Sequence, residues 1–134
     1  MSVPFLACMI AAASFHHLPV QALAAIQSVE GGAVGTVSVN KDGSADLGVM
    51  QVNTQWVPAV ARATRAKEAV VRARLIQDGC FSVKVAAAIL DVYKVEAHGN
   101  MVEAVGFYHS HTPDLKAAYQ TKVLAAAMRL RKKG

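Results

Sequence analysis

Three carboxylates lie around the one stretch of the sequence that lacks a helical pattern: Glu30, Asp42 and Asp46. Glu30 follows the apolar residues 24–26 and Val29, near the end of a predicted helix. Burial and the negative end of the helix dipole both disfavour the ionised form of such a carboxyl. A carboxyl that keeps its proton near neutral pH can serve as a general acid. Position alone also fits an ordinary exposed Glu at a helix end.

The other two carboxylates have simpler structural interpretations. Asp42 precedes Gly43 in a turn sequence, where Asp side chains bond the nearby backbone. Asp46 precedes a short helix predicted over residues 48–53, which it would cap. Ser110 lies between two histidines, but no nucleophile elbow surrounds it and adjacent residues rarely form a triad. Gly31 and Gly32 next to Glu30 would let a ligand approach the backbone.

The spacing of apolar residues predicts a mainly helical (α+β) chain with one small β element. The predicted helices cover residues 5–13, 19–30, 58–78, 80–95, 101–108 and 115–130. The first is apolar enough to predict a buried helix, and the helix over 80–95 is apolar on most sides, which predicts the central one. Alternation around Val37 and Val39 before an Asn-Lys-Asp-Gly turn favours a short β-hairpin or an ordered loop within residues 34–47.

Length and composition limit the class of protein. A chain of 134 residues predicts a single domain over 1–134, and 54% hydrophobic against 17% charged residues excludes a disordered linker. The net charge of +5 suits an anionic partner, but the basic residues are scattered and no groove-reading motif appears, so nucleic acid is not expected. No transmembrane segment is expected. The apolar stretch over 5–13 lacks a basic region before it, so any export signal is expected to have been removed.

Two cysteines, Cys8 and Cys80, permit one disulfide or two buried thiols, and the residues alone leave both open. Their spacing matches no metal-ligand pattern. No phosphate-binding loop or dinucleotide fingerprint is present, so we expect neither a metal nor a cofactor.

Three segments together resemble the lytic transglycosylases with a goose-type-lysozyme-like (SLT) domain. Residues 25–32 (AIQSVEGG) are similar to the helix that carries the catalytic Glu. Residues 40–53 (NKDGSADLGVMQVN) resemble the motif usually written G-L-M-Q, and 106–113 (GFYHSHTP) resemble the motif whose Tyr lines the site. The resemblance covers about Phe5 to Val123 and implies a lysozyme-like fold with the β-hairpin beside the active-site cleft.

The resemblance implies cleavage of the bond between N-acetylmuramic acid and N-acetylglucosamine in peptidoglycan. Glu30 would act as acid and then as base, leaving a 1,6-anhydro end. Gln51 and Tyr108 are expected to hydrogen bond to the sugar, and Met50 to form an apolar wall of the cleft. The implied substrate-binding set is completed by Gly48, Asn53, His109 and Tyr119.

The chain departs from the family pattern in three places. Gly31 replaces the Ser that usually follows the catalytic Glu and is thought to support it. Val49 replaces a Leu, and His109 replaces the Asn of the usual A-Y-N, a change common in a specialised subgroup.

The subgroup comprises small enzymes of conjugation, secretion and pilus systems. It implies a Cys8–Cys80 disulfide and a periplasmic or cell-envelope location. It also implies a monomer whose protein partners are components of such an apparatus. Two alternatives stay open: a muramidase hydrolase such as a phage lysin, which uses water and a second carboxylate, and a non-catalytic assembly factor that binds glycan.

Overall fold

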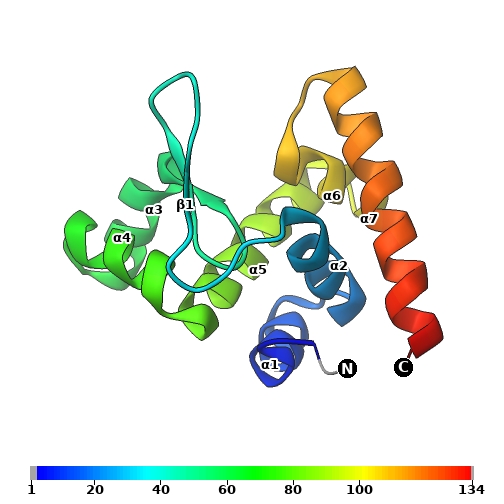
Figure 1. Ribbon diagram of the computed structural model, residues 1–134, viewed down its shortest axis with the longest axis horizontal. Helices are drawn as coiled ribbons and strands as arrows, with labels where there is room; N and C mark the ends of the chain where they lie inside the picture. Colours follow the sequence, from blue (N-terminus) through cyan, green and yellow to red (C-terminus); the bar gives the residue numbers. More distant parts are fainter. Residues whose placement is uncertain (1–2, 134) are drawn as a thin grey trace.

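The computed structural model describes residues 3–133, apart from the side chains of residues 132 and 133. Within that range, seven α-helices accompany a small three-stranded antiparallel sheet, which confirms the predicted mainly helical architecture (Figure 1). The elements in order are α1 Leu6–His16, α2 Val20–Glu30, β1 Val37–Val39, β2 Ala45–Leu47, β3 Val52–Asn53, the 3-10 helix η1 Thr54–Trp56, α3 Val57–Thr64, α4 Glu68–Gln77, α5 Gly79–Glu96, α6 Met101–His109 and α7 Pro113–Lys133.

Helix α5 lies at the centre of the fold, as its apolar sequence predicts. Ten of its residues are buried, and it packs on α1, α4 and α6. The side chain of Asp78 caps its first turn by accepting a hydrogen bond from the amide of Phe81 at 3.0 Å. Helix α2 packs mainly against α7, which brings the end of α2 next to the C-terminal helices.

The predicted hairpin is confirmed, and a third strand extends it. Val37 pairs with Leu47 and Val39 with Ala45, while Asp46 faces Asn53 across the β2–β3 pair. Asp42 closes the turn as expected, because its carboxylate accepts from the amide and the hydroxyl of Ser44 at 2.9 and 2.6 Å. The hairpin and the α6–α7 pair stand on opposite sides of the molecule in Figure 1.

The helix predicted over residues 48–53 is absent, and Asp46 is not a helix cap. Asp46 is the middle residue of β2, and a turn over residues 48–51 leads into β3. Gly48 and Gln51 have φ of +70° and +52°, in the left-handed region that a right-handed helix does not contain. The cap in this region is Asn53, whose side chain accepts from the amide of Gln55 at the start of η1.

Helix α1 is only partly buried, which corrects the prediction of a buried first helix. Met9, Ala12 and Ala13 face the core, but Ile10 is 52% exposed and Phe15 80% exposed. The sequence of α1 is apolar on every side, so its pattern could not show which face packs on α5 and which is left open.

A disulfide joins Cys8 of α1 to Cys80 of α5, which decides between the two states that the cysteines permit. The Cα atoms are 5.5 Å apart and the residues 72 positions apart in sequence. Two further contacts support the same junction: His16 Nδ1 lies 2.9 Å from Asp91 Oδ2, and Lys94 Nζ donates to the carbonyl of His17 at 2.9 Å. These links fix α1 to the central helix α5, and α1 also packs against α2.

Candidate active site

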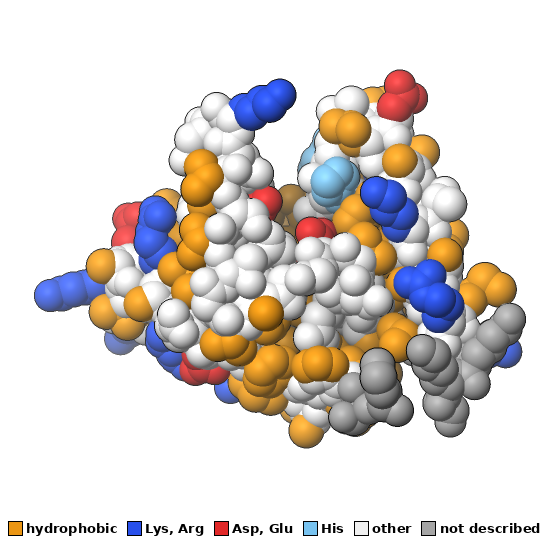
Figure 2. All heavy atoms as spheres, in the orientation of Figure 1, with side chains coloured by type: hydrophobic (Ala, Val, Ile, Leu, Met, Phe, Trp, Pro, Cys, Tyr) orange, Lys and Arg blue, Asp and Glu red, His pale blue; other side chains and the backbone are white. Residues whose placement is uncertain are grey.

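A cavity of about 300 Å³ lies between the β-hairpin and the junction of α2, α6 and α7. Figure 2 shows this hollow from the side, with acidic atoms inside it and basic side chains on the two projections that flank it. The lining includes five of the residues predicted for the site: Glu30, Gln51, Asn53, Tyr108 and His109. Both carboxylates of the hairpin, Asp42 and Asp46, line it too.

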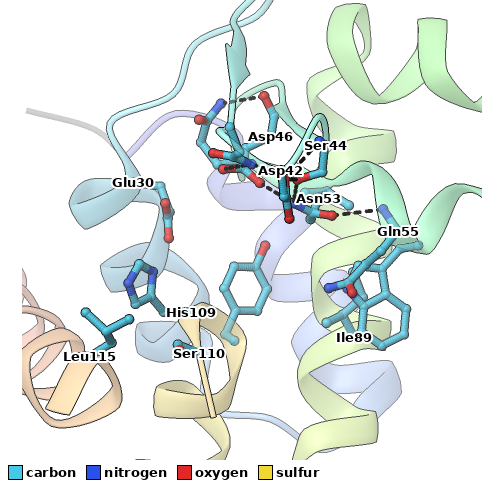
Figure 3. Close-up of a pocket in the computed structure, with 15 residues that line it drawn as sticks. Glu30, Asp42, Ser44, Asp46, Asn53, Gln55, Ile89, His109, Ser110 and Leu115 are labelled. Atoms are coloured by element: carbon cyan, nitrogen blue, oxygen red, sulfur yellow. Dashed lines mark hydrogen bonds between the residues drawn. The ribbon is translucent and has the colours of Figure 1, made fainter. Parts of the chain in front are cut away.

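Glu30 is the last residue of α2, and its half-buried carboxyl points into the cavity (Figure 3). Burial raises the pKa of the Glu30 carboxyl above its usual value, against the opposing effect of a hydrogen bond from Tyr119. The negative charge of Asp46 raises the pKa further, and that of Lys122 lowers it. The pKa is therefore shifted in the direction that a general acid requires.

Tyr119 supplies the polar contact that holds the Glu30 carboxyl. Its hydroxyl donates to Oε2 at 2.8 Å, and its side chain is only 4% exposed. Burial, together with the neighbouring Glu30, raises the pKa of the Tyr119 phenol far above its usual value, so the hydroxyl stays a donor. Because Tyr119 lies on α7 and Glu30 on α2, the contact between these two helices fixes the carboxyl.

Gly31, which replaces the usual Ser, ends α2 in the left-handed conformation. Its φ is +65°, and its amide donates to the carbonyl of Gln27. A Cβ at Gly31 would meet nothing within 4 Å, so backbone conformation is the feature here that favours glycine.

Gly32 serves a different purpose from the one its position predicts. A Cβ there would lie 2.3 Å from the carbonyl oxygen of Gly48 and 3.1 Å from that of Val49. The backbone that comes close to Gly32 is therefore the protein's own turn over residues 48–51, which occupies the space that a Gly32 side chain would fill.

Two aromatic residues of α6 form the wall beside Glu30. The hydroxyl of Tyr108 donates to the carbonyl of Met50 at 2.9 Å, which ties α6 to the turn before β3. Burial, with Glu30 and Asp46 nearby, raises the pKa of the Tyr108 phenol well above its usual value. The His109 ring stacks on that of Tyr119, with centroids 4.7 Å apart and planes 7° from parallel.

The opposite wall is the hairpin, where amide groups surround the carboxylate of Asp46. Asn53 Nδ2 donates to one oxygen at 3.0 Å and Asn40 Nδ2 to the other at 3.3 Å. Ser44 joins the cluster by accepting from both Asn side chains. Asp42 lies at the exposed end of this wall, where its bonds to Ser44 lower the pKa of its carboxyl.

The turn over residues 48–51 contributes one side chain to the cavity. Gln51 lines it, while its amide nitrogen donates to the carbonyl of Gly48 at 3.0 Å. Met50 is fully buried, so the prediction that its side chain forms a cleft wall is wrong. Gly48 lies outside the lining: a Cβ there would be 2.0 Å from the carbonyl oxygen of Leu75, which makes it a packing residue.

Several lining residues were not predicted individually. Gln55 and Trp56 lie two and three positions after the end of the second motif, which is the hint that the sequence offers for them. Ser110 lines the cavity but accepts a local bond from the amide of Thr112 at 3.0 Å, as a turn residue does. The remaining lining residues that were not predicted are Asn40, Ser44, Val52, Ile89 and Leu115.

Within residues 3–133, no three His, Cys, Asp or Glu side chains gather closely enough to bind a metal ion. Over the same range, no helix combines the length and apolar character that crossing a bilayer needs.

Comparison with known proteins gives one group of relatives. The chain is 36% identical over 94 residues to the invasion protein IagB of Salmonella typhimurium, and to the protein of the same name in Salmonella typhi. The matched region is 66% of this chain and 54% of each relative, so the chain spans about half the length of the curated relatives it matches. No family model matches the sequence. The chain is thus a distant homologue of the IagB invasion proteins.

Proposed function

We propose that this chain is a single lysozyme-like domain that cleaves the glycan strand of peptidoglycan as a lytic transglycosylase. The observation that carries the proposal is the Glu30 carboxyl, which faces the cavity with a raised pKa and a hydrogen bond from a buried phenol. The motifs that resemble the family indicate peptidoglycan as the substrate class. The surroundings of Glu30 in the cavity indicate acid–base chemistry.

One carboxyl group suffices for the two steps of this reaction. Protonated Glu30 gives its proton to the glycosidic oxygen, and the bond from that oxygen to the muramic C1 breaks with oxocarbenium character. The Glu30 carboxylate then takes the proton of the muramic C6 hydroxyl, whose oxygen bonds to C1. No water is consumed, and Glu30 ends protonated.

The surroundings of Glu30 suit both forms of the carboxyl. Burial favours the acid before the first step. The Tyr119 hydroxyl, donating to Oε2, stabilises the carboxylate between the steps. A carboxyl that must alternate between two protonation states needs a pKa balanced by opposing effects, and burial and this bond oppose each other.

Sugar binding is assigned to the polar side chains of the lining. The amide oxygen of Gln51 accepts no hydrogen bond from the described residues, so it is free for a sugar hydroxyl. The Tyr108 hydroxyl donates to the carbonyl of Met50, so it meets a sugar hydroxyl as an acceptor, and its ring forms a wall of the cavity. Asn53 has its amide nitrogen committed to Asp46 and Ser44, so it orients the hairpin wall.

The cell envelope is the proposed location. A disulfide between Cys8 and Cys80 is typical of oxidising compartments such as the periplasm. The relatives are named for invasion, which suits service to an envelope-spanning secretion, conjugation or pilus apparatus. The charge of +5 suits an anionic wall polymer.

A muramidase hydrolase is the second candidate, favoured by the position of Asp46. Asp46 does not cap a helix, and its carboxylate lines the same cavity as Glu30. Its negative charge raises the pKa of Glu30. A retaining glycosidase uses a second carboxylate as a nucleophile about 5 Å from the acid. The two candidates share Glu30 as acid and differ in what attacks C1.

The products distinguish the candidates. Purified peptidoglycan is digested with the wild-type chain, and the muropeptides are analysed by mass spectrometry with and without borohydride reduction. We expect 1,6-anhydro ends, which resist reduction, and none from Glu30→Gln. Reducible muramic ends would assign the hydrolase.

The matched control is Glu68→Gln, which removes an exposed carboxylate on α4, remote from the cavity. It should behave as the wild type. If neither the wild type nor the control releases muropeptides, the non-catalytic glycan-binding factor replaces both candidates.

A further inference from the structure

His109 is the one aromatic side chain stacked on Tyr119 within the described residues, and nothing in the mechanism above uses it. It is the last residue of α6, and the next residue leaves the helix in an extended conformation. Its ring is exposed, lines the cavity and lies beside Glu30 in Figure 3. Neither ring nitrogen has a hydrogen-bond partner among residues 3–133, so stacking is its main contact.

The stack covers one face of the Tyr119 ring, whose hydroxyl is the side-chain hydrogen-bond partner of the Glu30 carboxyl among the described residues. Three helices meet there: α2 ends at Glu30, α7 contributes Tyr119, and α6 ends at His109. With centroids 4.7 Å apart and planes 7° from parallel, the imidazole lies over the phenol ring. Aromatic pairs of this kind contribute beyond the area they bury.

Without that cover, the cavity side of the Tyr119 ring would meet water. Water would then compete for the hydroxyl and for Oε2 of Glu30, which are 2.8 Å apart. No other ring stacks on Tyr119 within the described chain, and the rest of its surface is packed in the core.

We propose that His109 is a positioning residue, whose ring holds Tyr119 in the orientation that donates a hydrogen bond to Glu30. It rests on the proposed function of Glu30 as acid and base. Through Tyr119, His109 sets the pH at which the Glu30 carboxyl loses its proton, and hence the alkaline limit of cleavage.

The sign of the effect follows from the groups that face Glu30. The bond from Tyr119 lowers the Glu30 pKa, as does the charge of Lys122 on the same helix, while Asp46 on β2 raises it. Tyr108 on α6 faces Glu30 as an uncharged phenol, because its pKa is well above the usual value. Removing the stack weakens the lowering bond, so the Glu30 pKa should rise.

The test compares His109→Ala, His109→Phe and Tyr119→Phe with the wild type. The Glu30 carboxyl is followed by carbon-13 NMR during a pH titration, and kcat/KM for glycan cleavage is measured over the same pH range. His109→Ala should raise the Glu30 pKa in the same direction as Tyr119→Phe and move the alkaline limb to higher pH. His109→Phe, which keeps a flat ring, should restore the wild-type titration.

Combining His109→Ala with Tyr119→Phe should shift the titration no further than Tyr119→Phe alone. An unchanged Glu30 titration in His109→Ala, beside a shifted one in Tyr119→Phe, would overturn the proposal. So would a His109→Phe variant that titrates like His109→Ala, since the imidazole itself would then matter. The titration needs no turnover, so a wild type that shows the NMR shifts but cleaves nothing would overturn the proposed function separately.

Discussion

The two walls of the cavity hold carboxylates in opposite kinds of surroundings. On the helical wall, Glu30 is half-buried, bonded to one phenol, and has a raised pKa. On the hairpin wall, Asp42 is exposed and bonded to Ser44, which lowers its pKa, and amide groups surround Asp46. Carboxylates of one cavity thus differ in chemistry because of their surroundings, and the raised pKa of Glu30 is the direction that the proposed acid requires.

The largest effect is expected from removing the carboxyl of the helical wall. Glu30→Gln should lower kcat/KM for glycan cleavage by about 10²–10⁴-fold, the usual contribution of a general acid. Gln is isosteric and can still accept from Tyr119, so circular dichroism should show an intact fold. Release of anhydromuropeptides within a few-fold of the wild-type rate would place the acid elsewhere.

The same substitution should change the pH dependence of stability. The folded-state pKa of Glu30 is raised above the usual value for a Glu carboxyl, so its stabilising contribution is complete below that usual value and declines as pH rises through the folded-state pKa. Gln does not titrate. Thermal unfolding should therefore show Glu30→Gln gaining stability relative to wild type from acid to neutral pH, and a constant difference would contradict the raised pKa.

The next effect in size concerns the disulfide that supports the helical wall. The link closes a loop between residues 72 positions apart, for which the chain-entropy model gives about 4 kcal/mol as an upper figure. The Cys8→Ser/Cys80→Ser variant should unfold at a lower temperature, with hydrogen exchange rising first in α1 and the adjoining α2. Two titratable thiols in the unreduced native protein would show that the link does not form.

Asp46→Asn should have a smaller effect and acts from the hairpin wall. The variant turns an acceptor of two amide N–H groups into a side chain with its own donor, which should cost about 1 kcal/mol of stability by urea unfolding. Removing its negative charge should also lower the Glu30 pKa. Anhydro products should persist. Loss of turnover as complete as in Glu30→Gln, with the fold retained, would assign Asp46 as the nucleophile of a hydrolase.

Asp42→Asn should change least. Its carboxylate is exposed and accepts two bonds from Ser44, and an Asn side chain can make the same turn contacts. Cleavage rate and unfolding temperature should stay close to those of the wild type. A marked loss of cleavage with unchanged folding would mean that the hairpin tip binds substrate through this carboxylate.

The sequence was most informative where local chemistry decides the structure. The position of Glu30 at a helix end, the turn at Asp42 and the central helix α5 all follow from short patterns, and all three are confirmed. The two glycines after Glu30 and the apolar run before it already pointed to this helix end.

The errors lie where tertiary packing decides. The left-handed residues Gly48 and Gln51 break the helix expected over 48–53, and that moves Asp46 from a cap to a strand. The same turn directs the side chain of Met50 into the core, and the Met50 carbonyl accepts a hydrogen bond from the Tyr108 hydroxyl. Tyr119 is 89 residues from Glu30, so only the resemblance, and no spacing, could suggest that pair.

The most direct test of the contrast between the two walls is a site-resolved titration of the carboxyl groups in the wild-type protein. Carbon-13 NMR of the Glu and Asp side chains, assigned with Glu30→Gln and Asp42→Asn, gives both pKa values in one experiment. We predict that Glu30 titrates above 4.5, the usual value for a Glu carboxyl, and Asp42 below 3.8, the usual value for an Asp carboxyl. A Glu30 carboxyl that titrates at or below 4.5 would be ionised when the glycosidic oxygen needs its proton, and that would contradict its role as the acid.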